Sequence, residues 1–232
     1  MQMKKPSSIK GLILSTIALS FLFFSGNVAH AASVTYSFTG SVTQANTPLT
    51  GSFISGTPMS GTFKFNNSSA TGGIYNGVVS GLTLNIGGYT AGYAGGANAV
   101  SILKNIDVGD GFLGDRWRLE TGAMVAPPSG AINVYSPVRF DLNLDREGSL
   151  FANTDMQNPP SLGGMLPLTG TRWRLVFESA SGNMVRVQGG LNSLSLTAVP
   201  LPAAVILFGA GLISLVGLGA GGLRNLRRPH QA

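Results

Sequence analysis

Very few side chains in the body of this chain could act as nucleophiles or as acid–base groups near neutral pH. The 232 residues include no cysteine and only two histidines, His30 and His230, both outside the central segment 33–198. That segment therefore has no Ser-His-Asp triad, no Cys-His pair and no histidine-ligated metal. We expect no enzyme activity, no cofactor and no metal site.

Three potential oxygen ligands for a cation, Asp107, Asp110 and Asp115, lie together on a glycine-rich segment. Ca²⁺ prefers carboxylate oxygens, but this spacing does not match the EF-hand loop. We favour a solvated loop, with calcium binding as the alternative.

A second group of acids could support hydrolysis of a polysaccharide. Asp141 and Asp145 alternate along a candidate strand, with Glu147 close by. Two carboxylates are what a glycosidase needs, so a polysaccharide-acting enzyme stays open as an alternative. Alternating acids are ordinary on an exposed strand face, and we favour that interpretation.

Both tryptophans of the chain lie in related tetrapeptides 56 residues apart, Arg116-Trp117-Arg118-Leu119 and Arg172-Trp173-Arg174-Leu175. On strands, each Trp shares one face with the Leu, and the arginines lie on the other. We favour two core strands with outward arginines. The alternative is a polysaccharide contact, through an arginine-lined strip or through Trp117 and Trp173, because sugar faces can stack on exposed indoles.

Apolar and polar residues alternate strictly in several parts of 33–198, which predicts antiparallel strands with one buried face. Glycine-, asparagine- and serine-rich segments separate these runs and indicate turns. We expect about eight to ten short strands in one all-β, antiparallel β-sandwich, jelly-roll-like in arrangement. The clearest runs are 34–39, 63–65, 82–86, 140–145 and 193–197.

The formal charge of +6 comes from the two ends of the chain. The segment 33–198 carries nine bases and nine acids and is neutral. Nucleic-acid binding needs cations clustered on one domain, so we expect no nucleic-acid partner. The unbalanced cations are Lys4, Lys5, Lys10, Arg224, Arg227 and Arg228.

The N-terminus has the pattern of a secretory signal peptide. Three lysines precede an apolar run, 11–24, whose 14 residues span only about 21 Å as a helix. Ala29 and Ala31 supply the small residues that a signal peptidase requires. We expect a signal peptide over 1–32, cleaved after Ala31 or Ala32, with a retained signal anchor as the alternative.

The C-terminal part contains 21 consecutive uncharged residues, 203–223, which span roughly 31 Å as a helix. Arg224, Arg227 and Arg228 follow at once and would hold the tail in the cytoplasm. We expect one transmembrane helix over 203–223 with a basic stop over 224–228. A buried core helix is the alternative.

Pro200, Leu201 and Pro202 precede this apolar stretch, and the two prolines favour an extended, accessible chain. The order of a Pro-x-Pro motif, an apolar helix and a terminal arginine cluster resembles the PEP-CTERM sorting domain of exported proteins in Gram-negative bacteria. The resemblance covers about 199–228 within the tail 199–232, and Leu201 replaces the family's middle glutamate. It implies that an exosortase-like membrane protease-transpeptidase processes the chain.

A competing sorting signal is the pentapeptide 166–170, which spells the LPXTG pattern of Gram-positive sortase substrates. A sortase motif lies directly before the apolar span, whereas 28 residues, 171–198, intervene before the tail here. A turn between strands is therefore the better interpretation.

Together these features predict an exported, non-enzymatic surface or extracellular-matrix protein. A precursor inserted in the inner membrane would be sorted to the cell surface or released. The alternative keeps the same tail and makes the body a carbohydrate-binding module or polysaccharide-acting enzyme, with an extracellular polysaccharide as partner.

Overall fold

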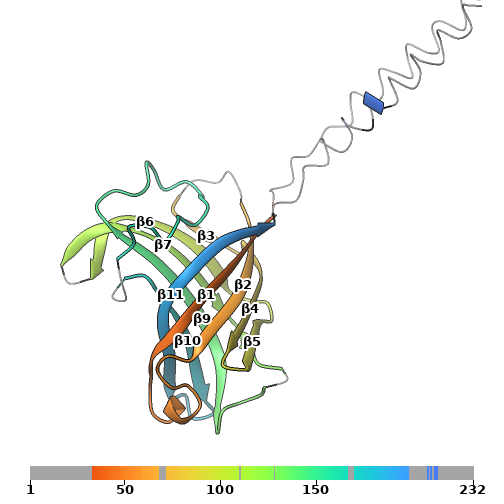
Figure 1. Cartoon of the computed structure of the whole chain (residues 1–232), viewed down its shortest axis with the longest axis vertical. Helices are drawn as coiled ribbons and strands as arrows, with labels where there is room; N and C mark the ends of the chain where they lie inside the picture. Colours follow the sequence, from red (N-terminus) through yellow and green to blue (C-terminus); the bar gives the residue numbers. More distant parts are fainter. Residues whose placement is uncertain are drawn as a thin grey trace, which may run out of the picture. The chain divides into compact units, whose positions relative to one another are not determined.

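The described part of the chain consists almost entirely of β-strands. The computed structural model describes residues 33–67, 72–109, 111–127, 129–166, 170–198, 208, 210 and 212–213. These residues contain eleven strands and one short 3₁₀ helix, η1 (Leu49–Gly51) (Figure 1). The strands are β1 (Ser33–Ala45), β2 (Pro58–Asn66), β3 (Ile74–Asn76), β4 (Val79–Ile86), β5 (Tyr89–Tyr93), β6 (Asn98–Gly109), β7 (Phe112–Gly122), β8 (Met124–Val125), β9 (Tyr135–Glu147), β10 (Arg172–Ser179) and β11 (Met184–Ala198).

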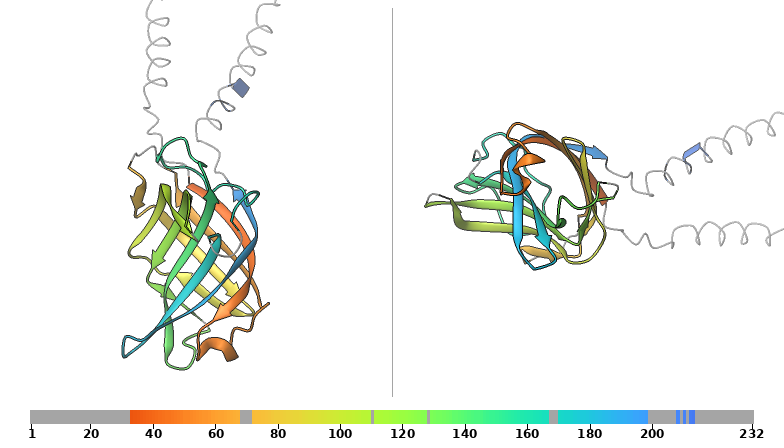
Figure 2. Two further views of the ribbon diagram at one scale, coloured as in Figure 1. Left: turned by 90° about the vertical axis from the view of Figure 1, so that its left-hand side faces the viewer. Right: turned by 90° about the horizontal axis from the view of Figure 1, so that it is seen from below.

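The eleven strands form one antiparallel sheet that curls on itself (Figures 1 and 2). Its order is β3-β6-β7-β9-β10-β11-β1-β2-β4-β5-β8. The expected all-β, antiparallel architecture is confirmed, but the strands are not divided into the two sheets of a sandwich. Several strands are longer than expected, with 13 residues in β1 and β9 and 15 in β11. Register shifts within the β1–β11 and β6–β7 pairs help such long strands to bend.

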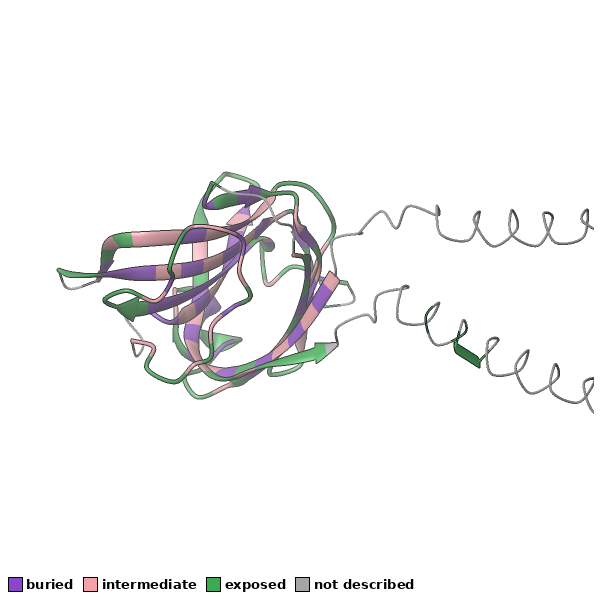
Figure 3. Cartoon of the chain, turned by 90° about the horizontal axis from the view of Figure 1, so that it is seen from above, coloured by how far each residue is buried: buried purple, intermediate pink, exposed green. Residues whose placement is uncertain are grey.

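Aromatic side chains fill the space that the curled sheet encloses. Figure 3 shows buried residues alternating with less buried ones along many of the strands. Phe63 of β2 lies 5.9 Å from Trp117 of β7, and Phe38 of β1 lies 6.1 Å from Phe140 of β9, between ring centroids. These strands are not neighbours in the sheet, so the rings can meet only because the sheet curls. Burial of each large apolar side chain contributes about 1.5–3 kcal/mol.

The fit of Trp173 depends on two glycines in the paired strands β1 and β11. A Cβ added at Gly189 would collide with the backbone oxygen of Ser41 and lie 2.9 Å from the Trp173 ring. A Cβ at Gly40 would collide with the backbone of Gly190 and lie 3.1 Å from Trp173 Nε1. The two strands therefore approach closely, and the indole packs directly on their backbone.

The connection from β9 to β10 returns to the sheet at several points. The backbone oxygen of Gln157 accepts a hydrogen bond of 3.0 Å from Trp117 Nε1, and the Leu166 amide donates to the backbone oxygen of Asp145 at 2.9 Å. The LPXTG-like pentapeptide 166–170 lies in this connection, and its residues 167–169 lie outside the described residues. Because β10 and β11 both follow the pentapeptide, its position is that of a connection inside the folded unit.

Residues Ala31–Pro200 form one compact unit, which contains the expected body 33–198. Of the expected span 203–223, only Phe208, Ala210, Leu212 and Ile213 are described, and all four are helical. Within the described part of the chain, no helix combines the length and the apolar character needed to cross a membrane. The predicted signal peptide and sorting residues lie outside the described residues: Ala29, Ala31, Pro200, Leu201, Pro202, Arg224, Arg227 and Arg228.

Candidate functional site

The outer face of β7, β9, β10 and β11 carries a set of charged side chains that we call the charged face. It arises because Trp117, Leu142, Trp173 and Val187 point into the core, so their neighbours along each strand point outward. Three cross-strand rows form in register, and Arg139 and Arg186 extend them. The charged face consists of Arg116, Arg118, Glu120, Arg139, Asp141, Asn143, Asp145, Arg172, Arg174 and Arg186.

Two carboxylates at the centre of the charged face are buried in ion pairs. Asp145 accepts two hydrogen bonds of 2.6 Å from Arg116, one from Nε and one from Nη2. Asp141 accepts one of 2.7 Å from Arg174 Nε. Both aspartate side chains are 0% exposed, while their arginines keep about a fifth of their surface in solvent, at 18% and 21%. The arginines therefore cover the acids and hold their own guanidinium groups at fixed positions.

The surroundings of two arginines on the charged face shift their pKa values in opposite directions. The hydrogen bond to Asp145 raises the pKa of Arg116 above its ordinary value. Burial lowers the pKa of Arg172, and the neighbouring positive charge of Arg174 lowers it further. The ordinary pKa of a guanidinium group is so high that both arginines carry positive charge at neutral pH.

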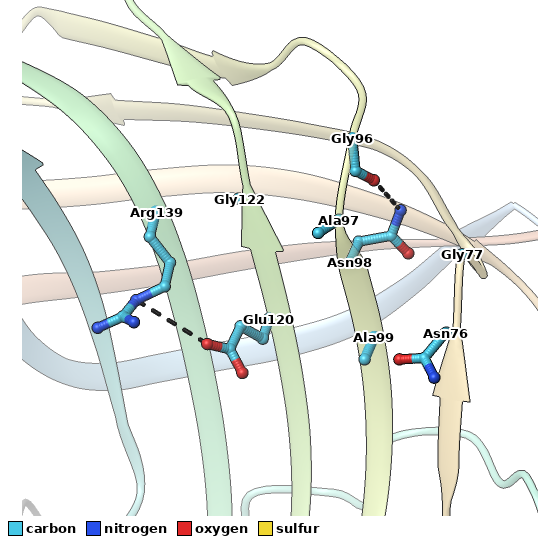
Figure 4. Close-up of a pocket in the computed structure, with 9 residues that line it drawn as sticks. All are labelled: Asn76, Gly77, Gly96, Ala97, Asn98, Ala99, Glu120, Gly122 and Arg139. Atoms are coloured by element: carbon cyan, nitrogen blue, oxygen red, sulfur yellow. Dashed lines mark hydrogen bonds and ion pairs between the residues drawn. The ribbon is translucent and has the colours of Figure 1, made fainter.

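Glu120 pairs with two arginines beside a hollow of the charged face, and Figure 4 shows its contact with Arg139. Its carboxylate lies 2.7 Å from Arg118 Nη2 and 3.9 Å from Arg139 Nε. The hollow has a volume of about 530 Å³ and is lined by residues that include Asn76, Asn98, Glu120 and Arg139. Amide, carboxylate and guanidinium groups therefore border one open space.

A smaller hollow of about 170 Å³ lies on the other side of Arg139. Arg139, Arg174 and Arg186 line it together with Asn46 and the buried Val176. The two hollows share Arg139, so a ligand longer than one chemical group could contact both.

The rest of the outer face is different in kind, and we call it the hydroxyl face. It covers β1, β2, β4 and the C-terminal half of β11. Serine and threonine hydroxyls pair across strands here: Ser37 with Ser195 at 2.9 Å, Thr39 with Ser193 at 2.6 Å and Thr62 with Thr83 at 2.8 Å. A hollow of about 840 Å³ lies over this face, lined by residues such as Ser37, Thr62 and Thr83. Hydroxyls offer weak, uncharged contacts, so the arginine-lined hollows are the stronger candidate site.

The positions of Asp141 and Asp145 correct the interpretation of an exposed acidic strand face. Both side chains are buried and paired with arginines, because the neighbouring strands place a guanidinium group opposite each of them. Neither lines the two hollows beside Arg139. Glu147 is exposed at the end of β9. This arrangement gives the glycosidase alternative no support.

The tryptophans are both buried, each 0% exposed, so the alternative of a sugar stacking on Trp117 or Trp173 gains no support. Trp173 Nε1 donates a hydrogen bond of 3.1 Å to the backbone oxygen of Gly190. The interpretation as core strands with outward arginines fits both tetrapeptides.

Asp115 has a structural role that the sequence did not reveal. It is only 2% exposed and accepts backbone hydrogen bonds from Asn105, Leu150 and Phe151 at 2.8–3.0 Å. Burial raises the pKa of this carboxyl, but the three amide donors outweigh burial and bring the pKa below its ordinary value. Among the described residues, which exclude Asp110, no group of three or more metal-ligating side chains occurs.

Sequence reasoning missed the small hollow, because Arg139, Arg174 and Arg186 come from three strands and share no motif. The only available signal was the outward direction predicted for the arginines of the two tetrapeptides. Arg139 and Arg186 stand outside those tetrapeptides and join them only through strand pairing.

The fold and site define an antiparallel all-β protein with an arginine-rich outer face. Compared with family models, curated proteins and solved structures, the chain has no match in any of the three.

Proposed function

We propose that this chain is an exported, non-enzymatic protein of the cell surface or extracellular matrix, sorted through its C-terminal tail. The observation that carries the proposal is the order of three segments: a signal-peptide pattern, a compact unit Ala31–Pro200, and a tail with a Pro-x-Pro motif, an apolar stretch and a basic stop. The partners would be the membrane and an exosortase-like protease-transpeptidase.

The described residues support this proposal at the two ends of the unit. Among the described residues, β1 already includes Ser33, close to the expected cleavage position, and β11 includes Ala198, two residues before Pro200. These two strands pair with each other, with Thr35 opposite Ala198. Within the expected span, the side chains of Phe208 and Ile213 are 70% and 76% exposed. Exposed apolar side chains on a helix suit contact with lipid.

A non-enzymatic role agrees with the chemistry of the described residues. The central segment has no cysteine or histidine, and Asp141 and Asp145, whose described side chains are fully buried, are held by arginines. A carboxylate in such a pair accepts hydrogen bonds from a cation that does not give up its proton, so it is poorly suited to proton transfer.

The sorting proposal is tested by fractionation and intact-mass measurement of the native protein, in cells with and without the processing enzyme. We expect the processed protein to start near Ala32 and to lack 223–232 only when the enzyme is present. The double variant Pro200→Ala/Pro202→Ala should accumulate unprocessed in the membrane. Pro127→Ala, at an exposed proline of the body, is the matched control and should be processed normally. An unchanged C-terminus in both strains overturns the proposal.

A further inference from the structure

We propose that the hollow formed by Arg139, Arg174 and Arg186 binds the carboxylate of an acidic polysaccharide, with the adjoining sugar in the hollow beside Glu120. The inference deepens the proposed function and rests on it for its setting, because such polymers occur outside the cell.

The three arginines lie around Val176 on the outer face, and Met184 and Val185 also line the hollow. Arg139, Val176 and Arg186 are register partners on β9, β10 and β11, so the two arginines flank Val176 from opposite sides. Arg174 precedes Val176 by two residues on the same strand and therefore on the same face. Neighbouring strands lie about 4.8 Å apart, which places the backbones of Arg139 and Arg186 about 10 Å from each other. Two guanidinium groups at that separation can both reach one bound anion.

The charges at this hollow are unbalanced. Arg174 is held in place by Asp141, whose carboxylate is buried beneath it. Arg139 lies 3.9 Å from Glu120, and its side chain is 44% exposed. The described residues that line the hollow include three arginines and no acid. Glu178 lies on the same face but does not line the hollow. An arginine fork binds a carboxylate through two parallel hydrogen bonds, so this hollow favours a planar anion.

The volumes of the hollows suit a sugar acid within a polymer. The small hollow, at about 170 Å³, has the volume of roughly five or six waters at about 30 Å³ each. That volume takes a carboxylate and part of its ring. The hollow beside Glu120 is three times larger, at about 530 Å³, and offers amide and carboxylate groups to hydroxyls (Figure 4). Because Arg139 borders both hollows, consecutive sugar units can occupy them together.

A nucleic acid fits this surface less well. Single-stranded nucleic acids stack their bases on aromatic side chains, and the described residues lining the two hollows include none. Glu120 in the larger hollow can accept hydrogen bonds from the hydroxyls of a sugar.

The test measures binding of hexameric oligogalacturonate to the purified full-length chain in detergent micelles at low salt. We expect saturable binding that weakens as salt is added, and little binding of the same oligomer after methyl esterification. The variant Arg139→Gln/Arg186→Gln should weaken binding tenfold or more. Both arginines are exposed, so the variant should fold, and the single Arg186→Gln variant is a milder version with a smaller effect.

The control Lys64→Gln/Arg146→Gln removes two exposed cations from outside both hollows and should change affinity less than twofold. The inference is overturned if the wild-type chain does not bind oligogalacturonate, or if the methyl ester binds equally well. It is also overturned if the control loses as much affinity, or if a single-stranded oligodeoxynucleotide binds as tightly through the same arginines. C-terminal processing measured on the same variants stays normal under the inference, so its failure is separate from failure of the sorting proposal.

Discussion

The charged face and the hydroxyl face are built on the same sheet, yet they differ in how they hold their polar groups. On the charged face, Asp141 and Asp145 are 0% exposed beneath arginines from neighbouring strands. On the hydroxyl face, side chains such as Thr39 and Thr62 are exposed and pair only with other hydroxyls. In both, register partners on adjacent strands meet, but only long arginine side chains cover their partners.

This difference predicts different tolerance to substitution. Each arginine of the charged face covers the buried aspartate with which it pairs. Removing one residue of such a pair leaves the charge of the other without a partner, which is costly. An exposed hydroxyl that loses its partner can bond to water instead. The charged face should therefore be rigid and sensitive to change, and the hydroxyl face tolerant.

The largest effect is expected for Asp145→Ala in the full-length chain, because Arg116 would lose both hydrogen bonds to its carboxylate. We expect the free energy of unfolding to fall by about 3–5 kcal/mol, measured by urea denaturation. Glu147→Ala removes an exposed acid from the same strand and should change it by less than about 0.5 kcal/mol. Equal effects of the two variants would show that the charged face is not a buried network.

A smaller loss is expected for Asp115→Asn, which tests a buried acid that is bonded to backbone amides instead of arginines. The amide has only one oxygen acceptor, and we expect a loss of about 2–3 kcal/mol at neutral pH. The folded pKa of Asp115 lies below the ordinary 3.8, so its contribution is present above that pH and disappears as pH falls through the lower folded value. The difference between wild type and variant should therefore shrink in strong acid, and a constant difference would contradict this account.

A smaller loss of stability than for Asp115→Asn is expected for Trp173→Phe, whose indole lies beneath the charged face. The variant loses the hydrogen bond to Gly190 and part of the packing on Gly189, which should cost about 1–2 kcal/mol. Binding of oligogalacturonate should not change, because the indole is 0% exposed. Acrylamide quenching of the wild-type tryptophan fluorescence should be weak, and strong quenching would place an indole at the surface.

The smallest effect is expected for Thr62→Val on the hydroxyl face. Its hydroxyl lies 2.8 Å from that of Thr83, and both side chains are exposed. The free energy of unfolding should change by less than about 0.5 kcal/mol, because water replaces the lost partner. A loss as large as that of Asp145→Ala would remove the distinction between the two faces.

Much of the fold could be predicted from local patterns. Alternation around Phe38, Phe63 and Leu142 correctly indicated antiparallel strands with one buried face, and it placed the arginines beside Trp117 and Trp173 outward. The number of sheets could not be predicted, because alternation says which face is buried and not which strand covers it. The sandwich and the curled sheet share the same alternation.

The candidate site was less predictable than the fold. Asp141 and Asp145 were expected on an exposed face, because they alternate with the apolar residues of β9 and so lie on the polar side of the strand. They are buried because the sheet order places β9 between β7 and β10, each of which brings arginines to the same face.

By itself the sequence determined the period of each strand, the composition of the two ends and the absence of histidine and cysteine from the body, because these depend on neighbouring residues or on counts. Strand order decided the rest. Arg139 lies 37 residues before Val176 and Arg186 lies ten residues after it, and the three meet only where β9, β10 and β11 pair side by side. Hydrogen bonding between backbones far apart in the chain sets that register, so the arginine-lined hollow exists only in the folded sheet.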